Sequence, residues 1–466
     1  MEIWNAWLSV VSFLRPACGR GRTFLWFASV LAGFSIRADT LGVTSIMRAL
    51  GFLECCYDRI MDFFNSRALD VSKLTLLWTT AVMRIFNPVK INGRLLIPAD
   101  GIKVPKTGRK MPGVKRLHQE SNNNNKPEYI FGHSIQAAGI LAGAFNSVFC
   151  VPLVARIHEG LIFSRNDKAT TMDKLIGMLN NLTVLPAYYL IADAYYSCAP
   201  VIRGLLDKGN HLISRVRMNA VAYRAAPKVQ DKHKRGRKKK FGRKIKLTSL
   251  FSRGYLFKRT KCVFYGKKDV TVLVACLDLV MRRTGIMTRY VLVRHPQRGD
   301  IILMTTDLTL EPEKVIAAYM LRFKIEVSFK QAIHTVGTYL YHFWSKCMKA
   351  FTRKSGNQVI SGETEKYKGK IMSKVDTYHR HIQMGIIAQG LLQYLSSIFS
   401  EKIRSDMTTY IRTKKKGNAA SEAVVRDYMR EVFPEFLVTS GKYGKLTEFI
   451  RRRLQPKRWR FMRLAS

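Results

Sequence analysis

Acidic residues are scarce in this chain of 466 residues. Asp and Glu together number 32, whereas Lys and Arg number 79, so the formal net charge is +47. Such an excess of one sign repels itself in a compact fold and therefore favours a polyanionic partner. Nucleic acid is the first candidate, because each neutralised phosphate releases counterions, and a membrane surface is the second. A small acidic substrate explains the charge poorly, because one site needs only a few cations.

Paired cysteines and long apolar runs are also missing. The eight cysteines form no C-x-x-C pair, which argues against a zinc ribbon or finger and suggests buried thiols in a reducing compartment. The apolar stretch Phe24–Ile36 is too short to cross a bilayer, and glycines and a proline interrupt the stretch 135–155, which we expect to be two strands joined by a turn. The first basic residue is Arg15, so no cleavable signal is convincing. We expect a soluble cytosolic protein without a membrane partner.

Changes in amino-acid composition and in the spacing of apolar residues divide the chain into five segments. Three-to-four spacing of apolar residues predicts a helical N-terminal domain, and strands that alternate with helices after it predict an α/β domain. A basic, β-rich segment follows, then helices, then a basic helical C-terminal region. The segments are 1–88, 89–220, 221–308, 309–400 and 401–466.

Within the first segment, a short helix that begins at Val43 and is closed by Gly51 precedes a second helix near 57–64. A short helix, a glycine turn and a second helix are compatible with a helix-turn-helix DNA reader, in which Arg48 contacts DNA. A small helical bundle without a DNA-binding role gives the same pattern. The sequence leaves both interpretations open.

The run 228–246 holds eleven Lys or Arg and a single acid, so it cannot pack into a core. We expect it to follow a DNA backbone through Arg237, Lys238, Lys239, Lys240 and Arg243. A solvated linker or a nuclear-localisation signal are the alternatives. The C-terminal run 451–460 is also basic, and its Trp459 suits either stacking on a base or packing into a core.

Three acids stand out by their positions. Asp100 and Asp193 each follow a buried apolar strand, where open α/β sheets place ligands, and Glu326 lies on a helix that begins at Pro312. At about 100° per residue, Glu326 shares one helix face with three other side chains. Carboxylates in such positions suit two Mg²⁺ ions for phosphoryl transfer, although each acid alone also fits a turn, a helix cap or a surface ion pair. The three side chains on the face of Glu326 are Tyr319, Arg322 and Lys330.

The order Asp100, Asp193 and Tyr319-x-x-Arg322-x-x-x-Glu326 resembles the DDE transposases of bacterial cut-and-paste insertion sequences, in particular the group with a β-rich insertion before the final Glu. The resemblance extends over most of the chain and includes the segments 44–51, 99–101 and 191–196. It implies an α/β fold: a ribonuclease H-like catalytic core interrupted by a β-rich insertion, with a helical N-terminal DNA-binding domain and a helical C-terminal region.

The same resemblance implies the chemistry and the partners. Asp100, Asp193 and Glu326 are expected to hold two Mg²⁺ ions, or Mn²⁺, and the activity is DNA cleavage at terminal inverted repeats followed by strand transfer into target DNA. The active form is expected to be a homodimer in a synaptic complex, in the bacterial cytoplasm at the nucleoid. Two rivals stay open: a catalytically inactive descendant that binds DNA as a repressor or architectural factor, and a metal nuclease without strand transfer.

Two departures from the family pattern matter. The family carries a Lys seven residues after the Glu, where this chain has Ile333, so we expect Lys330 to bind phosphate beside Arg322 while Ile333 packs inward. Tyr319 is expected to position the phosphate. The segment 221–308 also lacks Trp, the usual aromatic wedge of relatives that form hairpins, so the sequence does not decide whether hairpins form.

Overall fold

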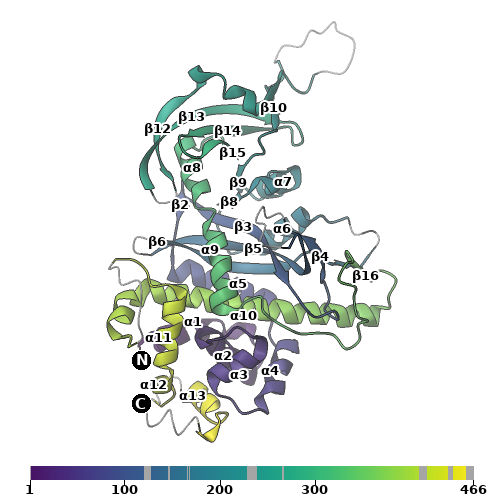
Figure 1. The fold of residues 1–466 in the computed structure, drawn as a ribbon, viewed down its shortest axis with the longest axis vertical. Coiled ribbons are helices and arrows are strands. Elements are labelled where there is room, and N and C mark those ends of the chain that lie inside the picture. The colour runs from purple at the N-terminus through teal and green to yellow at the C-terminus, as the bar shows by residue number, and fades with distance from the viewer. Residues whose placement is uncertain are drawn as a thin grey trace.

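The structure, a computed structural model, describes residues 2–119, 127–144, 147–164, 166, 168–227, 239–264, 267–408, 417–438 and 444–457. Three regions follow one another along the long axis of the molecule (Figure 1). An antiparallel sheet forms one end, a mixed sheet with helices forms the middle, and a helical region that contains both termini forms the other end. The protein is therefore a mixed α/β protein, as the sequence predicts.

The N-terminal segment is helical, as predicted, and shares its core with the C-terminal helices. Trp4, for example, stacks on Phe436 with ring centroids 4.7 Å apart. The predicted short helix ends at Gly51, whose φ of +72° closes it in the left-handed conformation that glycine adopts readily. The helices are α1 (Glu2–Phe13), α2 (Gly21–Ile36), α3 (Gly42–Leu50), α4 (Cys56–Asn65), α5 (Val71–Ile85), α11 (Glu422–Glu431), α12 (Phe433–Val438) and α13 (Gly444–Arg451).

The middle region is built on five strands in the order β6-β5-β3-β8-β9. The strands β3, β8 and β9 run parallel, whereas β5 and β6 run antiparallel to their neighbours. The apolar stretch 135–155 forms part of the β5–β6 pair, which confirms the prediction of two strands. The bounds are β3 (Arg94–Pro105), β5 (Tyr129–Ala144), β6 (Ser147–Ile157), β8 (Tyr188–Ala192) and β9 (His211–Arg215), with helices α6 (Thr171–Asn180) and α7 (Ala199–Leu206).

The β-rich segment extends this sheet rather than forming a separate one. Its last strand, β15, pairs antiparallel with β9, and β14 and β13 follow outward, so the strands of the end region continue from the middle region (Figure 1). The strands are β10 (Val221–Tyr223), β11 (Lys244–Lys246), β12 (Lys258–Phe264), β13 (Lys267–Met281), β14 (Ile286–His295) and β15 (Gly299–Thr305). Shorter strands elsewhere are β1 (Asn87–Pro88), β2 (Lys90–Ile91), β4 (Lys115–His118), β7 (Leu161–Ile162) and β16 (Gln358–Val359).

The helix that the sequence predicts to begin at Pro312 and to carry Glu326 is broken, so the prediction of one continuous helix is wrong. The structure has α8 (Pro312–Met320) and α9 (Lys324–Gln331), joined by a turn at 321–323. In this turn the backbone N–H groups of Arg322 and Lys324 bond three residues back rather than four, which tightens the chain and ends α8. The single helix face predicted to carry Tyr319, Glu326 and Lys330 is therefore interrupted between α8 and α9.

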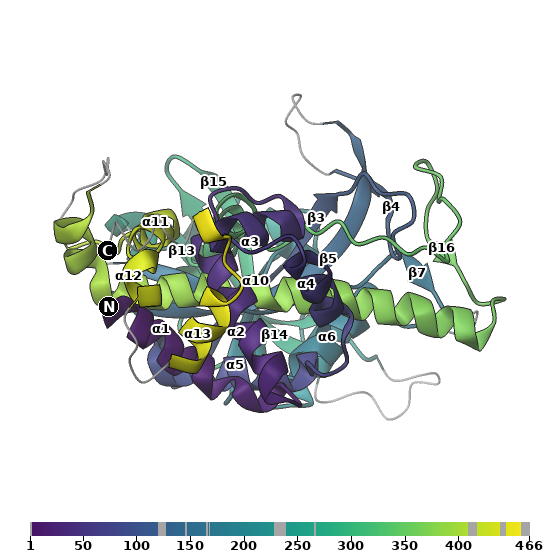
Figure 2. The ribbon, with the colours of Figure 1, turned by 90° about the horizontal axis from the view of Figure 1, so that it is seen from below.

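The helix α10 (Glu365–Asp406) has 42 residues and runs along the helical region, packed against β6, α2, α5 and α11 (Figure 2). By length and composition alone it is able to cross a membrane, but 78% of its most apolar window is buried inside the protein. Gln383 and Gln393 on this helix donate to the backbone carbonyls of Leu153 and Cys150. These contacts are those of a helix at the centre of a folded core.

The two histidines His133 and His295 are structural. His133 is fully buried, where its ring nitrogens contact the carbonyl of Pro112 and the hydroxyl of Tyr341, and burial lowers its pKa to about 3. Nδ1 of His295 accepts the backbone N–H groups of Gln297 and Arg298. His133 thus stabilises core contacts, and His295 stabilises a turn.

Close packing between α10 and α5 leads to a stability prediction. A Cβ added at Gly390 would lie 2.2 Å from Cζ2 of Trp78, whose indole is fully buried and donates to the carbonyl of Pro152. Gly390→Ala should therefore lower the free energy of unfolding by about 1–3 kcal/mol. Gly369→Ala on the same helix meets nothing within 4 Å and should raise it by about 0.5–1 kcal/mol. Thermal denaturation of both variants measures the two effects, and equal melting temperatures would contradict the packing.

Candidate active site

Asp100 and Asp193 occupy equivalent positions on neighbouring parallel strands. Pro98 of β3 pairs with Ile191 of β8, and each acid lies two residues further along its chain. Asp193 directly follows the end of β8, as predicted. The prediction that Asp100 ends its strand is wrong, because β3 continues to Pro105 by pairing with β5 after its pairing with β8 stops. The continuous buried stretch of β3, residues 95–99, is what ends directly before Asp100.

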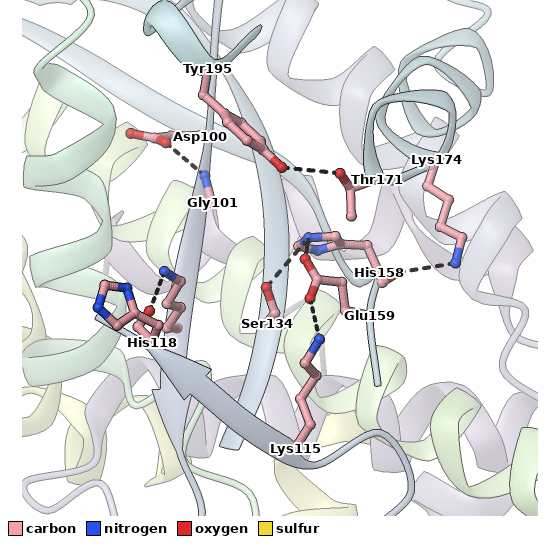
Figure 3. Close-up of polar contacts among 11 residues, drawn as sticks. Asp100, Gly101, Lys115, His118, Ser134, His158, Glu159, Thr171, Lys174 and Tyr195 are labelled. Atoms are coloured by element: carbon pink, nitrogen blue, oxygen red, sulfur yellow. Dashed lines mark hydrogen bonds and ion pairs between the residues drawn. The ribbon is translucent and has the colours of Figure 1, made fainter. Parts of the chain in front are cut away.

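Both aspartates line one pocket of about 200 Å³. Oδ1 of Asp100 accepts the backbone N–H of Gly101 at 2.8 Å, as Figure 3 shows, and Oδ1 of Asp193 accepts that of Tyr195 at 2.9 Å. These bonds hold one oxygen of each carboxylate against the backbone. The parallel register of β3 and β8 therefore brings two carboxylates that are 93 positions apart in the sequence (193 − 100) to one pocket.

Arg322 connects the third acid to this pair. Its Nη1 lies 3.0 Å from Oδ2 of Asp100, and its Nη2 lies 2.6 Å from Oε1 of Glu326. The side chain of Arg322 is 18% exposed, whereas that of Glu326 is 57% exposed. The turn between α8 and α9 thus places a guanidinium between β3 and α9, and Glu326 approaches the pocket through this cation rather than by lining it.

The two other acids contribute to the electrostatics of Asp100. Burial raises the pKa of Asp100 from its ordinary 3.8 to about 6; the Arg322 cation opposes this, while the charges of Asp193 and Glu326 add to it. Burial, followed by the charges of Asp100 and Asp193, also raises the pKa of Tyr196. A buried carboxylate with two further acids nearby is stabilised in its charged form when a cation enters beside it.

The donor set suits a divalent cation, but the three carboxylates are not gathered around one point. Hard oxygen ligands are those that Mg²⁺ prefers, and the pair Asp100 and Asp193 offers them in one pocket. Within the described part of the chain, however, no group of three acidic, His or Cys side chains has the spacing of a metal site. Glu326 is bound to Arg322 instead. The three-ligand metal site stays a prediction.

The other predicted residues on this face are divided by the break in the helix. Tyr319, on α8, is half-buried; burial raises its pKa, and the charges of Arg322 and Asp193 act on its hydroxyl. Lys330 is exposed on α9. Ile333 is partly buried and packs against the main hydrophobic core, which confirms that it points inward. A phosphate-binding role for Lys330 stays a prediction.

The predicted DNA contacts lie away from the carboxylate pocket. Arg48 is exposed on α3 and forms an ion pair with Asp39 at 2.8 Å. Lys239, Lys240 and Arg243 are exposed before β11. Their roles in DNA binding are not tested by these positions. Arg237, Lys238 and Trp459 lie outside the described residues.

Sequence reasoning missed a polar group in the same pocket, His158 and Glu159 (Figure 3). Oε1 of Glu159 lies 3.3 Å from Nε2 of His158, and its Oε2 lies 2.7 Å from Nζ of Lys115. These contacts, led by the hydrogen bond with His158, lower the pKa of Glu159 to about 2. Ser134 approaches the same Nε2 at 3.4 Å, so the three do not form a Ser-His-acid relay, which needs both ring nitrogens. The sequence signal that could have pointed to these residues is their position: His158 and Glu159 directly follow the apolar strand β6.

The comparisons with known proteins agree with the class of site. Residues 163–337 match the family described as "Transposase DDE domain", a class of phosphoryl-transfer enzymes. The match covers little more than a third of the chain; it includes Asp193 and Glu326, and Asp100 precedes it. The chain therefore contains a segment similar to a DDE transposase domain.

Among solved structures, the chain is similar to the piggyBac transposase synaptic complex with hairpin DNA, with 13% identity over 98% of this chain and 81% of that chain. The TM-score is 0.37, at which the likeness does not establish a shared fold. No curated protein matches the chain.

The raised pKa of Asp100 leads to a prediction about stability in the presence of a chelator. Between about pH 4 and pH 6 the folded state binds more protons than the unfolded chain, so the free energy of unfolding falls as the pH rises through this range. Asp100→Asn removes the buried charge and should raise the free energy of unfolding at pH 7 by about 1–3 kcal/mol. Denaturant unfolding measures this gain, which should disappear near pH 4.

Asp307 provides the matched control with the opposite sign. Burial acts to raise its pKa, but hydrogen bonds from Thr309 and Tyr189 outweigh burial and lower it. Asp307→Asn should therefore lower the free energy of unfolding at pH 7. A destabilised Asp100→Asn variant at pH 7 would show that the site holds its carboxylate in a favourable environment, contrary to this account.

Proposed function

We propose that this protein is a transposase that cleaves DNA at terminal inverted repeats and joins the cut ends to target DNA, with a divalent metal as cofactor. The observation that carries the proposal is the convergence of three acids from distant segments: Asp100 on β3 and Asp193 after β8 line one pocket, and Arg322 joins Asp100 to Glu326 on α9. The match of residues 163–337 to a transposase DDE domain supports the same reaction class.

The strand order supports a ribonuclease H-like core. Three antiparallel strands, β6, β5 and β3, are followed by two strands parallel to β3; Asp100 lies on β3, and Asp193 directly follows the adjacent β8. The antiparallel segment from β10 to β15 then separates these two acids from the helix with the third acid. This is the order of core and insertion that the sequence resemblance implies.

In this proposal Asp100, Asp193 and Glu326 hold Mg²⁺ or Mn²⁺. The metal, when bound, supplies stabilisation of the charge that develops on the attacking and leaving oxygens during phosphoryl transfer. Arg322 provides a fixed cation beside the carboxylates, which suits it to neutralise a DNA phosphate, while the half-buried Tyr319 positions that phosphate. Lys330, exposed one helical turn beyond Glu326, adds a second cation.

The charge of the chain supports DNA as the partner. A net charge of +47 is far more than one phosphate site needs, and it suits a protein that binds two DNA ends and a target. We propose that the active form is a homodimer that holds both ends in a synaptic complex. The exposed cations Arg48, Lys239, Lys240 and Arg243 are candidates for phosphate contacts outside the catalytic pocket.

Cleavage of the DNA that flanks its own reading frame tests the proposal. Purified protein with Mg²⁺ should cut this DNA at inverted repeats and join the ends to a plasmid, and a chelator should stop both reactions. Asp193→Asn should reduce cleavage by at least about a thousandfold while binding to the repeats stays within about twofold, because one carboxylate contributes little to total DNA affinity. Gel-resolved cleavage and a mobility-shift assay give the two readouts.

Three results would separate the alternatives. Repeat binding without cleavage by the wild type would favour an inactive DNA-binding descendant. Cleavage without joining would favour a nuclease. Full cleavage by Asp193→Asn would remove Asp193 from the catalytic site.

A further inference from the structure

A larger pocket of about 670 Å³ adjoins the carboxylate pocket. The two pockets share Gln136 and His158 in their walls. The larger one is enclosed by α5, β6, α6 and the region of α10 around His379. Its volume falls in the range of small-molecule sites, which are few in a protein of this size. None of the residues to which we assign a role in transposition lines this larger pocket.

The walls of this pocket contain two cations and no carboxylate among the described residues. The cations are Arg156 and Lys174, whereas burial lowers the pKa of the lining His379 well below its ordinary value and leaves that imidazole neutral. Such a wall attracts an anion, because a charge removed from water is unfavourable unless a group of opposite charge compensates it.

Arg156 is the fixed cation of the pocket. Its Nη1 donates to Oε1 of Gln383 at 3.1 Å and its Nη2 to Oγ1 of Thr75 at 2.9 Å, so these contacts orient the guanidinium. Burial lowers its pKa to about 10, and the charge of Asp376 offsets this only in part. Within the described part of the chain no carboxylate forms an ion pair with Arg156. A guanidinium held by neutral partners is preorganised for an incoming anion.

His158, which lines both pockets, has one ring nitrogen without a hydrogen-bond partner among the described residues. Its side chain is 8% exposed, and both of its side-chain contacts, with Ser134 and Glu159, are made by Nε2. Nδ1 is buried and has no hydrogen-bond partner among the described residues. A buried polar atom without a partner is costly, so a ligand that reaches Nδ1 gains from satisfying it.

The remaining wall is apolar and suits a ring. Aliphatic surface comes from Leu76 on α5, Val154 on β6, Met178 on α6 and Leu182 just after α6, and Asn181 adds an amide. An anion site with an adjoining apolar wall and an amide matches a phosphate with a sugar and a base attached. A simple inorganic anion leaves the apolar part of the volume unused.

We propose that this pocket binds a nucleotide, with the phosphate at Arg156 and Lys174 and the base against the wall formed by Leu76, Met178 and Leu182. The source is either a free nucleotide or a nucleotide of a DNA strand that extends from the carboxylate pocket. The second source rests on the proposed transposase function, because it requires DNA at Asp100 and Asp193.

Binding of deoxyadenosine 5′-monophosphate tests the proposal directly. Calorimetry in the presence of a chelator and at moderate ionic strength should detect one site per chain, with inorganic phosphate binding at least about tenfold more weakly because it lacks the base. Lys174→Gln should weaken nucleotide binding about tenfold. Leu76→Trp, which fills the apolar part, should abolish it, and circular dichroism verifies that the variant is folded.

Lys73→Gln is the matched control. Lys73 is exposed on the same helix as Leu76, outside the pocket, and its loss removes one positive charge as Lys174→Gln does. The proposal requires that this control bind the nucleotide within about twofold of the wild type. Equal weakening in the two lysine variants, equal affinity for phosphate and nucleotide, or unchanged binding by Leu76→Trp would each overturn it.

A competition experiment distinguishes the sources and keeps this inference separate from the function. A short single-stranded oligonucleotide that displaces the mononucleotide identifies the DNA strand as the source, and one that does not displace it identifies a free nucleotide. Nucleotide binding without DNA cleavage by the wild type would refute the proposed function and leave the pocket intact. Cleavage without nucleotide binding would refute the pocket alone.

Discussion

A single guanidinium holds the candidate site together. Arg322 contacts Asp100 on β3 and Glu326 on α9, and these two acids are separated in the sequence by the whole antiparallel segment from β10 to β15. Burial raises the pKa of Asp100, and the mostly buried Arg322 cation offsets part of this rise and of the smaller contribution from the other acids. The break between α8 and α9 has a physical role in this arrangement, since the tight turn at 321–323 contains the guanidinium-bearing residue itself.

The sheet determines what surrounds this cation. The parallel register of β3 and β8 brings Asp100 and Asp193 to equivalent positions, and the antiparallel β5 and β6 add Gln136 and His158 beside them. The same two side chains open onto the larger pocket, whose walls come from α5, α6 and α10. A carboxylate pocket that suits cations thus adjoins a basic pocket that suits anions, and the two share a wall in which Nδ1 of His158 has no partner among the described residues.

Local sequence signals predicted the elements well where one physical cause dominates. The apolar strands before Asp100 and Asp193, the glycine that closes α3 and the β-rich segment all follow from local patterns, and the inward packing of Ile333 followed from its apolar side chain alone. The errors arose where tertiary contacts decide. Pairing with β5 extends β3 beyond Asp100. The helix α8 ends where backbone N–H groups bond to carbonyls three residues back rather than four, although the apolar periodicity of the sequence continues. His158 and Glu159 were missed because only the fold brings the end of β6 to the carboxylates. The DNA-binding and metal roles depend on partners, which neither local pattern nor packing supplies.

Metal-specific rescue of cleavage tests the central claim that these carboxylates act by binding a divalent cation. Asp193→Cys replaces a hard oxygen ligand with a thiolate, which binds Mg²⁺ poorly and softer cations such as Mn²⁺ or Cd²⁺ much better. The account predicts that the variant does not cleave repeat DNA with Mg²⁺ and regains at least about a hundredfold in rate with the softer ion. The wild type, with its native cysteines, serves as the control for effects of the ion itself. Equal cleavage by the variant and the wild type in Mg²⁺, or no recovery with any softer ion, would contradict a metal-binding role for Asp193.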